Sequence, residues 1–272
     1  MNKQKIADFF DQCAPWWDAD MIRNEPVIRK ILDNAGIRAG IHVLDVACGT
    51  GVLFPDYFGR QVASVTGIDI SPEMAKLAQN KFPEATVICG DVEQTDFDRQ
   101  FDAVVVYNAF PHFPEPEKLI EALAKVCKPG GRMTVAHGMS RKSLQAHHAG
   151  RASEVSIDLI HQEELADLMH RWFQVDVIIS DDQMYQVCGV RREQEELTPR
   201  PAEADPVMEE LLALMKYMVG HNDAHAQELT ELSQRLKKAG KESAARALME
   251  AVASFDVANA QLSAVLDQLK QD

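Results

Sequence analysis

Residues 43–51 read VLDVACGTG, and this stretch decides the fold. An apolar run ends at Val46, and a turn that contains Gly49 and Gly51 then leads into a helical stretch. Glycine lets a backbone turn sharply and approach a ligand closely, because it has no Cβ. The loop has neither the GxGxxG spacing of dinucleotide sites nor the lysine of a phosphate-binding P-loop. It therefore predicts a ligand site of another kind at the carboxyl end of a strand.

Apolar runs alternate with helical stretches on both sides of this loop. The runs that we predict as strands are 42–46, 64–70, 86–89, 101–107, 132–137, 173–179 and 185–190. Near-continuous apolar strands between helices are typical of a parallel sheet that is covered on both faces. Residues 180–184 are too few for a crossover helix, so the last two strands should be antiparallel. The sequence thus predicts an α/β protein with a Rossmann-like, doubly wound, mostly parallel sheet and an antiparallel last strand.

Two further predicted strands end in acidic residues. Asp69 lies at the end of the second strand, and Asp91 follows the third. The Asp69 carboxylate can accept hydrogen bonds from a ribose diol, and Asp91 can accept a hydrogen bond from the exocyclic amine of an adenine. One such acid alone would more simply be a strand-end cap or a solvated charge. With Asp45 in the first strand, three acids at successive strands favour a nucleoside-bearing ligand.

The strand FDAVVVYN at 101–108 and the motif KPGG at 128–131 complete a set of five motifs. In their order and spacing, residues 1–192 resemble the class I S-adenosylmethionine-dependent methyltransferases. The resemblance implies S-adenosylmethionine as the cofactor. It implies that Asp69 holds the ribose hydroxyls and that Asn108 lies near the sulfonium. The cofactor-binding residues that it implies are Asp45, Ala47, Gly49 and Gly51 around the methionine part, Asp69 and Ile70, Asp91 and Val92 around the adenine, and Asn108.

Methyl transfer requires a positioned nucleophile and a site without water, and it requires a base only when the nucleophile carries a proton. Histidines follow the predicted strand ends, and the candidate catalytic residues are His112, His137 and His148. Histidine serves as a base or as a metal ligand, and a structural or surface role is the alternative. Residues 1–40 look helical and contain the aromatic residues Phe9, Phe10, Trp16 and Trp17. They form either a lid over the pocket, as in similar methyltransferases, or plain packing on the sheet.

The composition limits the partners. The net charge of −14 disfavours nucleic acid as a substrate, because the negatively charged protein would repel the phosphate backbone. No stretch reads as a signal peptide, and no apolar run approaches the ~20 residues that span a bilayer. We therefore expect a cytoplasmic protein without a membrane partner.

Residues 193–206 are charged and rich in proline, which predicts a linker, and residues 207–272 predict a helical hairpin. Its two helices, 207–238 and 241–269, are separated at Gly240. His221, His225 and Glu228 share one helical face and are candidate ligands for a transition metal. The alternative is a hydrogen-bonded polar layer that fixes the register of the helices, with Asn222 near Asn259. The apolar face of the hairpin also needs a partner, for which the methyltransferase domain and a second copy in a homodimer are candidates.

The predicted domain plan is a lid at 1–40, a cofactor-binding domain at 41–192, the linker and the hairpin. The expected function is S-adenosylmethionine-dependent methyl transfer to a small-molecule acceptor. Two alternatives stay open. One is a metal-handling or sensing protein that binds the cofactor without turnover, and the other is a protein methyltransferase.

Overall fold

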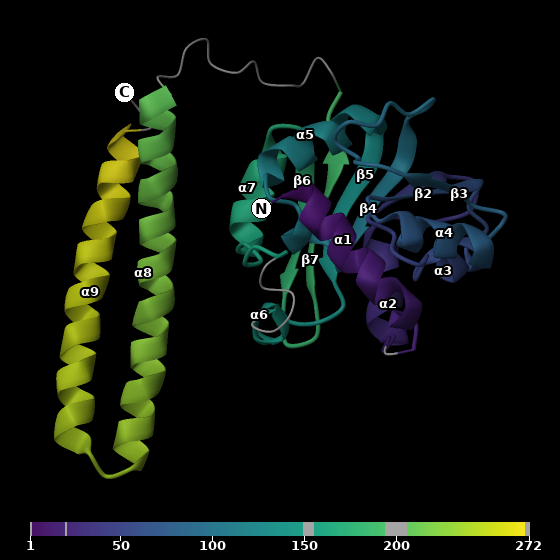
Figure 1. The fold of residues 1–272 in the computed structure, drawn as a ribbon. Coiled ribbons are helices and arrows are strands. Elements are labelled where there is room, and N and C mark those ends of the chain that lie inside the picture. The colour runs from purple at the N-terminus through teal and green to yellow at the C-terminus, as the bar shows by residue number, and fades with distance from the viewer. Residues whose placement is uncertain (1, 20, 149–154, 194–205, 270–272) are drawn as a thin grey trace. The chain divides into compact units, whose positions relative to one another are not determined.

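The computed structural model describes residues 2–19, 21–148, 155–193 and 206–269. The chain divides into two compact units, residues 1–198 and 199–272. The first unit contains the sheet, and the second contains the helical hairpin (Figure 1).

A sheet in the first unit has the strand order β3-β2-β1-β4-β5-β7-β6 (Figure 1). Strands β1 to β5 pair in parallel, while β7 is antiparallel to both β5 and β6. The predicted topology is therefore confirmed, and the strand ends differ from the predicted ones by at most one residue except at β5, which begins earlier, at Cys127. The strands are β1 His42–Val46, β2 Ser64–Asp69, β3 Thr86–Cys89, β4 Phe101–Tyr107, β5 Cys127–His137, β6 Phe173–Ser180 and β7 Tyr185–Arg191.

Short helices connect these strands, and their ends follow local capping rules. Helix α4 is an example: Ser71 precedes it, and its hydroxyl accepts a hydrogen bond from the Met74 N–H at 3.1 Å, while Pro72 occupies the first turn. The helical elements of this unit are α1 Lys3–Cys13, η1 Ala14–Trp16, α2 Glu25–Asn34, α3 Phe54–Gly59, α4 Pro72–Lys81, η2 Phe110–His112, α5 Pro116–Val126, α6 Arg141–His148 and α7 Gln162–His170.

Strand β4 shows why the central strands are apolar throughout. Its residues Val104 and Val106 are buried in one core cluster, and Ala103 and Val105 are buried in another. Because successive side chains point to opposite faces of a strand, both faces of the sheet are covered. Polar side chains are thereby directed to the strand ends.

The strand order reverses between β1 and β4, which are neighbours at the centre of the sheet. Ligands of open α/β sheets bind in the crevice at the carboxyl ends of the strands beside such a switch point. The residues that follow the two strands, Ala47 and Asn108, have positive φ angles of 51° and 54°. Non-glycine residues rarely adopt this conformation, and they often do so at functional sites.

The second unit is an antiparallel pair of long helices, α8 Pro206–Lys238 and α9 Glu242–Leu269 (Figure 1). The chain reverses at Gly240, whose φ of +73° suits glycine at a helix end. As expected, Asn222 lies beside Asn259: its side-chain amide donates to the Asn259 Oδ1 at 3.1 Å. Asn259 in turn donates to the Val219 carbonyl at 3.0 Å. A polar layer therefore joins the two helices.

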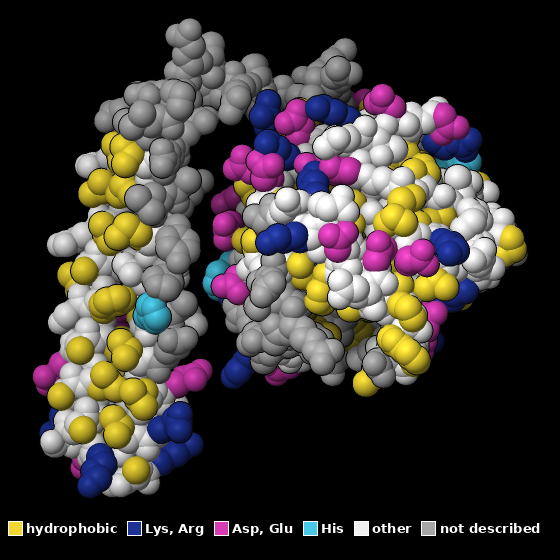
Figure 2. Space-filling model, viewed as in Figure 1, with side chains coloured by type: hydrophobic (Ala, Val, Ile, Leu, Met, Phe, Trp, Pro, Cys, Tyr) yellow, Lys and Arg dark blue, Asp and Glu magenta, His cyan; other side chains and the backbone are white. Residues whose placement is uncertain are grey.

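Large apolar side chains remain exposed along this hairpin (Figure 2). None of the described helices is both long enough and apolar enough to cross a membrane.

Candidate active site

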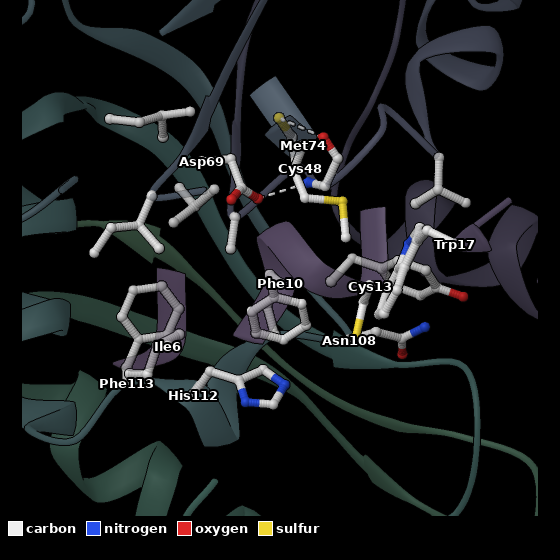
Figure 3. Close-up of a pocket in the computed structure, with 18 of the residues that line it drawn as sticks. Ile6, Phe10, Cys13, Trp17, Cys48, Asp69, Met74, Asn108, His112 and Phe113 are labelled. Atoms are coloured by element: carbon white, nitrogen blue, oxygen red, sulfur yellow. Dashed lines mark hydrogen bonds between the residues drawn. The ribbon is translucent and has the colours of Figure 1, made fainter. Parts of the chain in front are cut away.

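A cavity of about 750 Å³ lies at the carboxyl ends of β1, β2 and β4 (Figure 3). Such a volume lies within the usual range for small-molecule sites. One side is the floor, formed by residues 46–49, 68–70, 90–92 and 107–109 of the sheet. The opposite side, which we call the lid, is formed by residues 3–19 and 21–23.

Asp69 is the central acid of the floor. Its carboxylate accepts the Gly49 N–H at 2.8 Å and the Ser71 N–H at 2.9 Å. The side chain is 6% exposed, and burial raises its pKa to about 6, although these two backbone hydrogen bonds oppose the shift. The β1 loop and the start of α4 therefore hold one carboxylate at the cavity.

Gly49 and Gly51, in the loop that follows β1, have different structural roles. Gly49 lines the cavity with a φ of +56°, and a Cβ there would meet only the Trp17 Nε1 at 3.7 Å. Gly51 lies outside the cavity lining, and a Cβ there would come within 2.9 Å of both Phe54 and Phe82. Gly49 thus leaves room at the site, while Gly51 permits the loop to pack on the aromatic side chains beneath it.

Asp45 lies beneath this loop and outside the residues that line the cavity. It is 2% exposed, and a hydrogen bond with the Tyr57 hydroxyl acts to lower its pKa. Burial raises its pKa to about 8, and the charge of Asp69 acts in the same direction. Two buried carboxylates, Asp69 in the floor and Asp45 beneath it, thus have surroundings that oppose their ionisation.

Asp91 follows β3, and it lines the cavity together with Val92 and Ile70. Lys3 of the lid reaches it, with its Nζ 2.7 Å from the Asp91 Oδ2 and 2.8 Å from a Glu93 carboxylate oxygen. Burial lowers the pKa of Lys3, but the two carboxylates outweigh it and raise the pKa overall. The first turn of α1 is therefore joined to the floor.

Two further acids of the lid bind the loops of the floor. Asp11 accepts the Ser71 hydroxyl at 2.5 Å, at the start of α4. Asp18 accepts the Thr50 hydroxyl at 2.6 Å and the Lys81 ammonium at 2.7 Å. The contacts with Ser71 and Thr50 join the lid to segments that also carry predicted cofactor residues, and the contact with Lys81 joins it to the end of α4.

Aromatic rings form the wall that the lid adds to the cavity. The ring of Phe10 meets Trp17 edge-on at 5.6 Å and His112 at 4.9 Å between centroids. Figure 3 shows Ile6, Phe10 and Cys13 of α1 directed into the cavity. Trp16 lines the cavity as well, while Phe9 does not. This wall favours an apolar or aromatic ligand.

The structure distinguishes among the three candidate catalytic histidines. His112 lines the cavity, and its Nδ1 lies 2.9 Å from the Val155 carbonyl oxygen and 3.2 Å from the Ser156 hydroxyl. His137 is fully buried, packs edge-on against Tyr185 and lies outside the cavity lining. The side chain of His148 lies outside the described residues. Only His112 is therefore placed where it can reach a ligand in the described cavity.

Of the nine predicted cofactor residues, those that line the cavity are Ala47, Gly49, Asp69, Ile70, Asp91, Val92 and Asn108. Asn108 is exposed, and its Oδ1 accepts the Gly138 N–H at 2.9 Å. The sequence prediction missed Lys3, Asp11 and Asp18. No local pattern marks Asp11 or Asp18, because their hydroxyl partners lie 60 and 32 residues away in the chain.

The predicted metal ligands are described only in part. His225 is exposed on α8, while the side chains of His221 and Glu228 lie outside the described residues. Among the described side chains, no group of three or more His, Cys, Asp and Glu is placed to hold a metal ion. The metal site stays a prediction.

Comparison with known proteins agrees with this geometry. Residues 44–135 match a methyltransferase domain family, and residues 211–269 match a domain of unknown function, DUF8180. A ubiquinone biosynthesis O-methyltransferase of Coxiella burnetii is 31% identical over 49% of this chain and 61% of its own length. A demethylmenaquinone methyltransferase of Renibacterium salmoninarum is 33% identical over 48% of this chain and 58% of its own length. The chain thus spans about three fifths of the length of these relatives.

Solved structures share the fold. A Haloferax volcanii methyltransferase, solved in complex with the activator Trm112, superposes with a TM-score of 0.59 at 19% identity, over 70% of this chain and 98% of the other. The N-methyltransferase NodS of Bradyrhizobium japonicum, solved with S-adenosylhomocysteine, gives a TM-score of 0.53 at 14% identity over the same shares. The sheet order, the polar floor at the switch point and the match of residues 44–135 to a methyltransferase domain family all agree with the resemblance of the first unit to class I S-adenosylmethionine-dependent methyltransferases.

Proposed function

We propose that this protein transfers a methyl group from S-adenosylmethionine to a hydroxyl oxygen of a small, largely aromatic acceptor. The observation that carries the proposal is one continuous cavity with two chemically different sides. The floor presents the carboxylates of Asp69 and Asp91, and the lid presents aromatic rings and faces His112. Each side has the chemistry of one of the two reactants.

The residues of the floor fit the cofactor. Asp69 and Asp91 supply acceptors for a ribose diol and an adenine amine, and Gly49 leaves space beside the loop. Asn108, whose Oδ1 accepts the Gly138 N–H, lines the floor of the cavity at the end of β4. When bound, S-adenosylmethionine supplies an activated methyl group on a sulfonium, and the protein then has to orient the acceptor and exclude water.

His112 is the base in this proposal. Because the Val155 carbonyl accepts from Nδ1, the neutral ring carries its proton there, and Nε2 is the basic nitrogen. The acceptor hydroxyl gives its proton to Nε2 while its oxygen forms the new bond to the methyl carbon. Bound S-adenosylmethionine would supply the leaving group for this transfer, because the electron pair of its carbon–sulfur bond would stay on sulfur. The products are a methyl ether, S-adenosylhomocysteine and a protonated His112, which releases its proton to water.

The choice of acceptor rests on the lid and on the relatives. The rings of Phe10 and Trp17 favour a flat, apolar ligand. Two of the similar proteins are quinone-pathway methyltransferases by name. We therefore propose phenols and catechols with an apolar substituent as the first acceptors to try.

The test measures both cofactor binding and methyl transfer. Calorimetric titration with S-adenosylhomocysteine should show micromolar binding, and a radiolabelled methyl group should pass to a catechol acceptor. His112→Gln should reduce kcat by about 100-fold, the usual effect of a lost general base, and leave cofactor affinity within about twofold. The matched control is His170→Gln, a change at an exposed histidine of α7 that leaves kcat unchanged.

Three results would contradict the proposal. Absence of cofactor binding by the intact chain would remove its basis. Binding without turnover of any phenol, thiol or amine would favour the alternative of a sensing protein. Turnover that depends on a protein acceptor from a lysate would favour a protein methyltransferase.

A further inference from the structure

The hairpin has a packing pattern that the methyltransferase chemistry does not use. Its buried residues recur every seven positions, at Ala226 and Ser233 on α8 and at Ala245, Val252, Asn259 and Leu266 on α9. A seven-residue recurrence is the seam of an antiparallel coiled coil. The hydrogen bond between Asn222 and Asn259 fixes the register of this seam.

In each helix, the residues directly before the seam residues form a row along one side. Because the helices are antiparallel, the two rows lie on the same side of the hairpin. On α8 these residues are Leu211, Met218, His225 and Leu232, and on α9 they are Ala244, Ala251, Ala258 and Val265. All eight are exposed, and the four large apolar ones keep 43–46% of their surface. We call these eight residues the apolar face. Figure 2 shows apolar side chains along the length of the hairpin.

The opposite side of the seam differs in character. The residues four positions after each seam residue lie on this side. They include the polar residues Thr230, Lys237, Asp256 and Ser263, and the large apolar residue Met249. A helix pair that is polar on one side and apolar on the other resembles half of a four-helix bundle.

The size of the apolar face fits a second copy of the same hairpin. The apolar face runs over residues 211–232 and 244–265, which at about 1.5 Å per residue span about 32 Å, and two helices are together about 20 Å wide. The footprint of the face is thus roughly 600 Å² per copy, at the lower end of the ~600–1,000 Å² that each partner contributes to a stable interface.

The charges of the hairpin select the orientation of that copy. The turn end, residues 229–250, contains five Lys and Arg against three Asp and Glu. The rest of the hairpin, residues 206–228 and 251–272, contains two Lys against seven Asp and Glu. Two hairpins with their turns at opposite ends bring the basic end of each copy against the acidic end of the other.

We propose that the apolar face binds a second copy of the hairpin, head to tail, so that the protein is a dimer held by a four-helix bundle. In this arrangement Met218 becomes buried, whereas Met249, on the other side of the seam, stays in solvent. The two methionines are 45% and 42% exposed in the single chain. They therefore form a matched pair for mutation.

The experiment is sedimentation equilibrium on the full chain, without substitution and with Met218→Glu or Met249→Glu. We expect a dimer that Met218→Glu weakens by about 100-fold or more, because a buried charge without a partner is strongly unfavourable. Met249→Glu should leave the dissociation constant within about twofold. If Met218→Glu reduces the helical circular dichroism, Leu232→Gln at the turn end replaces it.

Orientation is tested by cross-linking. Head-to-tail packing places Leu211 of one copy near Leu232 of the second, so Leu211→Cys with Leu232→Cys should give more cross-linked dimer with a short bismaleimide than the unsubstituted chain. A monomer at all concentrations would overturn the proposal, and so would a dimer that Met249→Glu weakens as much as Met218→Glu. A dimer without the added cross-link would overturn the head-to-tail arrangement.

Discussion

The floor and the lid of the cavity are held in place by different kinds of interaction. On the floor, the Asp69 carboxylate is almost fully buried and accepts two backbone N–H groups. The lid is attached through side chains, such as Lys3 on Asp91 and Asp18 on Lys81, which remain partly exposed. Buried charge-assisted hydrogen bonds are worth more than partly exposed ion pairs. We infer that cofactor binding at the floor depends mainly on Asp69, whereas closure of the lid depends on several weak side-chain contacts.

The largest effect is expected from Asp69→Asn. The Gly49 and Ser71 N–H groups donate to different oxygens of Asp69, and an asparagine side chain has only one acceptor oxygen. It also lacks the negative charge that strengthens hydrogen bonds from a ribose diol. S-adenosylhomocysteine should bind about 100-fold more weakly, as measured by calorimetry. Asp33→Asn, at an exposed carboxylate of α2, is the control. A change of less than fivefold would show that the floor does not depend on one residue.

Next in size is Phe10→Ala, which opens the wall between Trp17 and His112. We expect kcat/KM for a catechol acceptor to fall by about 10-fold, because the acceptor loses its aromatic contact and water enters. Cofactor affinity should change little. Phe9→Ala is the matched control, since Phe9 is the neighbour of Phe10 on α1 but does not line the cavity. Equal losses from both substitutions would show that α1 acts only as packing.

Asp45, which lies beneath the floor, should make the stability of the first unit depend on pH. Since burial raises its pKa from 3.8 to about 8, Asp45 keeps its proton in the folded chain where the unfolded chain has lost it. Its stabilising contribution is full below pH 3.8 and is lost as the pH rises through 8. The slope is at most about 1.4 kcal/mol per pH unit. Asp45→Asn should remove this decline, which chemical denaturation at pH 6, 7 and 8 measures.

The control for this series is Asp98→Asn, which changes a side chain that is 84% exposed. Its free energy of unfolding should follow that of the unsubstituted chain at every pH. If Asp45→Asn also follows it, the buried carboxylate does not control the stability of the floor.

The smallest effect is expected from Lys3→Met, which removes one joint between lid and floor. Lys3 is 28% exposed at its side chain, and partly exposed ion pairs contribute at most about 1 kcal/mol. The KM for the acceptor should rise by about threefold or less. Cofactor affinity should not fall, because Asp91 is then open to the adenine. A loss of cofactor affinity beyond threefold would place Lys3 in the cofactor site itself.

Much of this molecule is readable from its sequence, for physical reasons that particular residues show. The run at 42–46 is mostly apolar because residues on both faces of β1 are buried, and this makes the strand visible as a pattern. Asp69 and Asp91 were predictable because carboxyl ends of parallel strands meet at one edge of the sheet. Asn222 and Asn259 were predictable as neighbours because a hairpin pairs residues by their distance from its turn, Gly240.

Other features arise only when distant segments meet. The sequence suggests that Gly51 borders the cofactor, but in the fold it packs on Phe54 and Phe82. The sequence treats His112 and His137 alike, and only the burial of His137 against Tyr185 separates them. The contacts of Asp11 and Asp18 depend on where α1 comes to lie. Local pattern therefore determined the strands and the floor, while tertiary packing decided which side chains face the cavity, because that depends on partners far away in the chain.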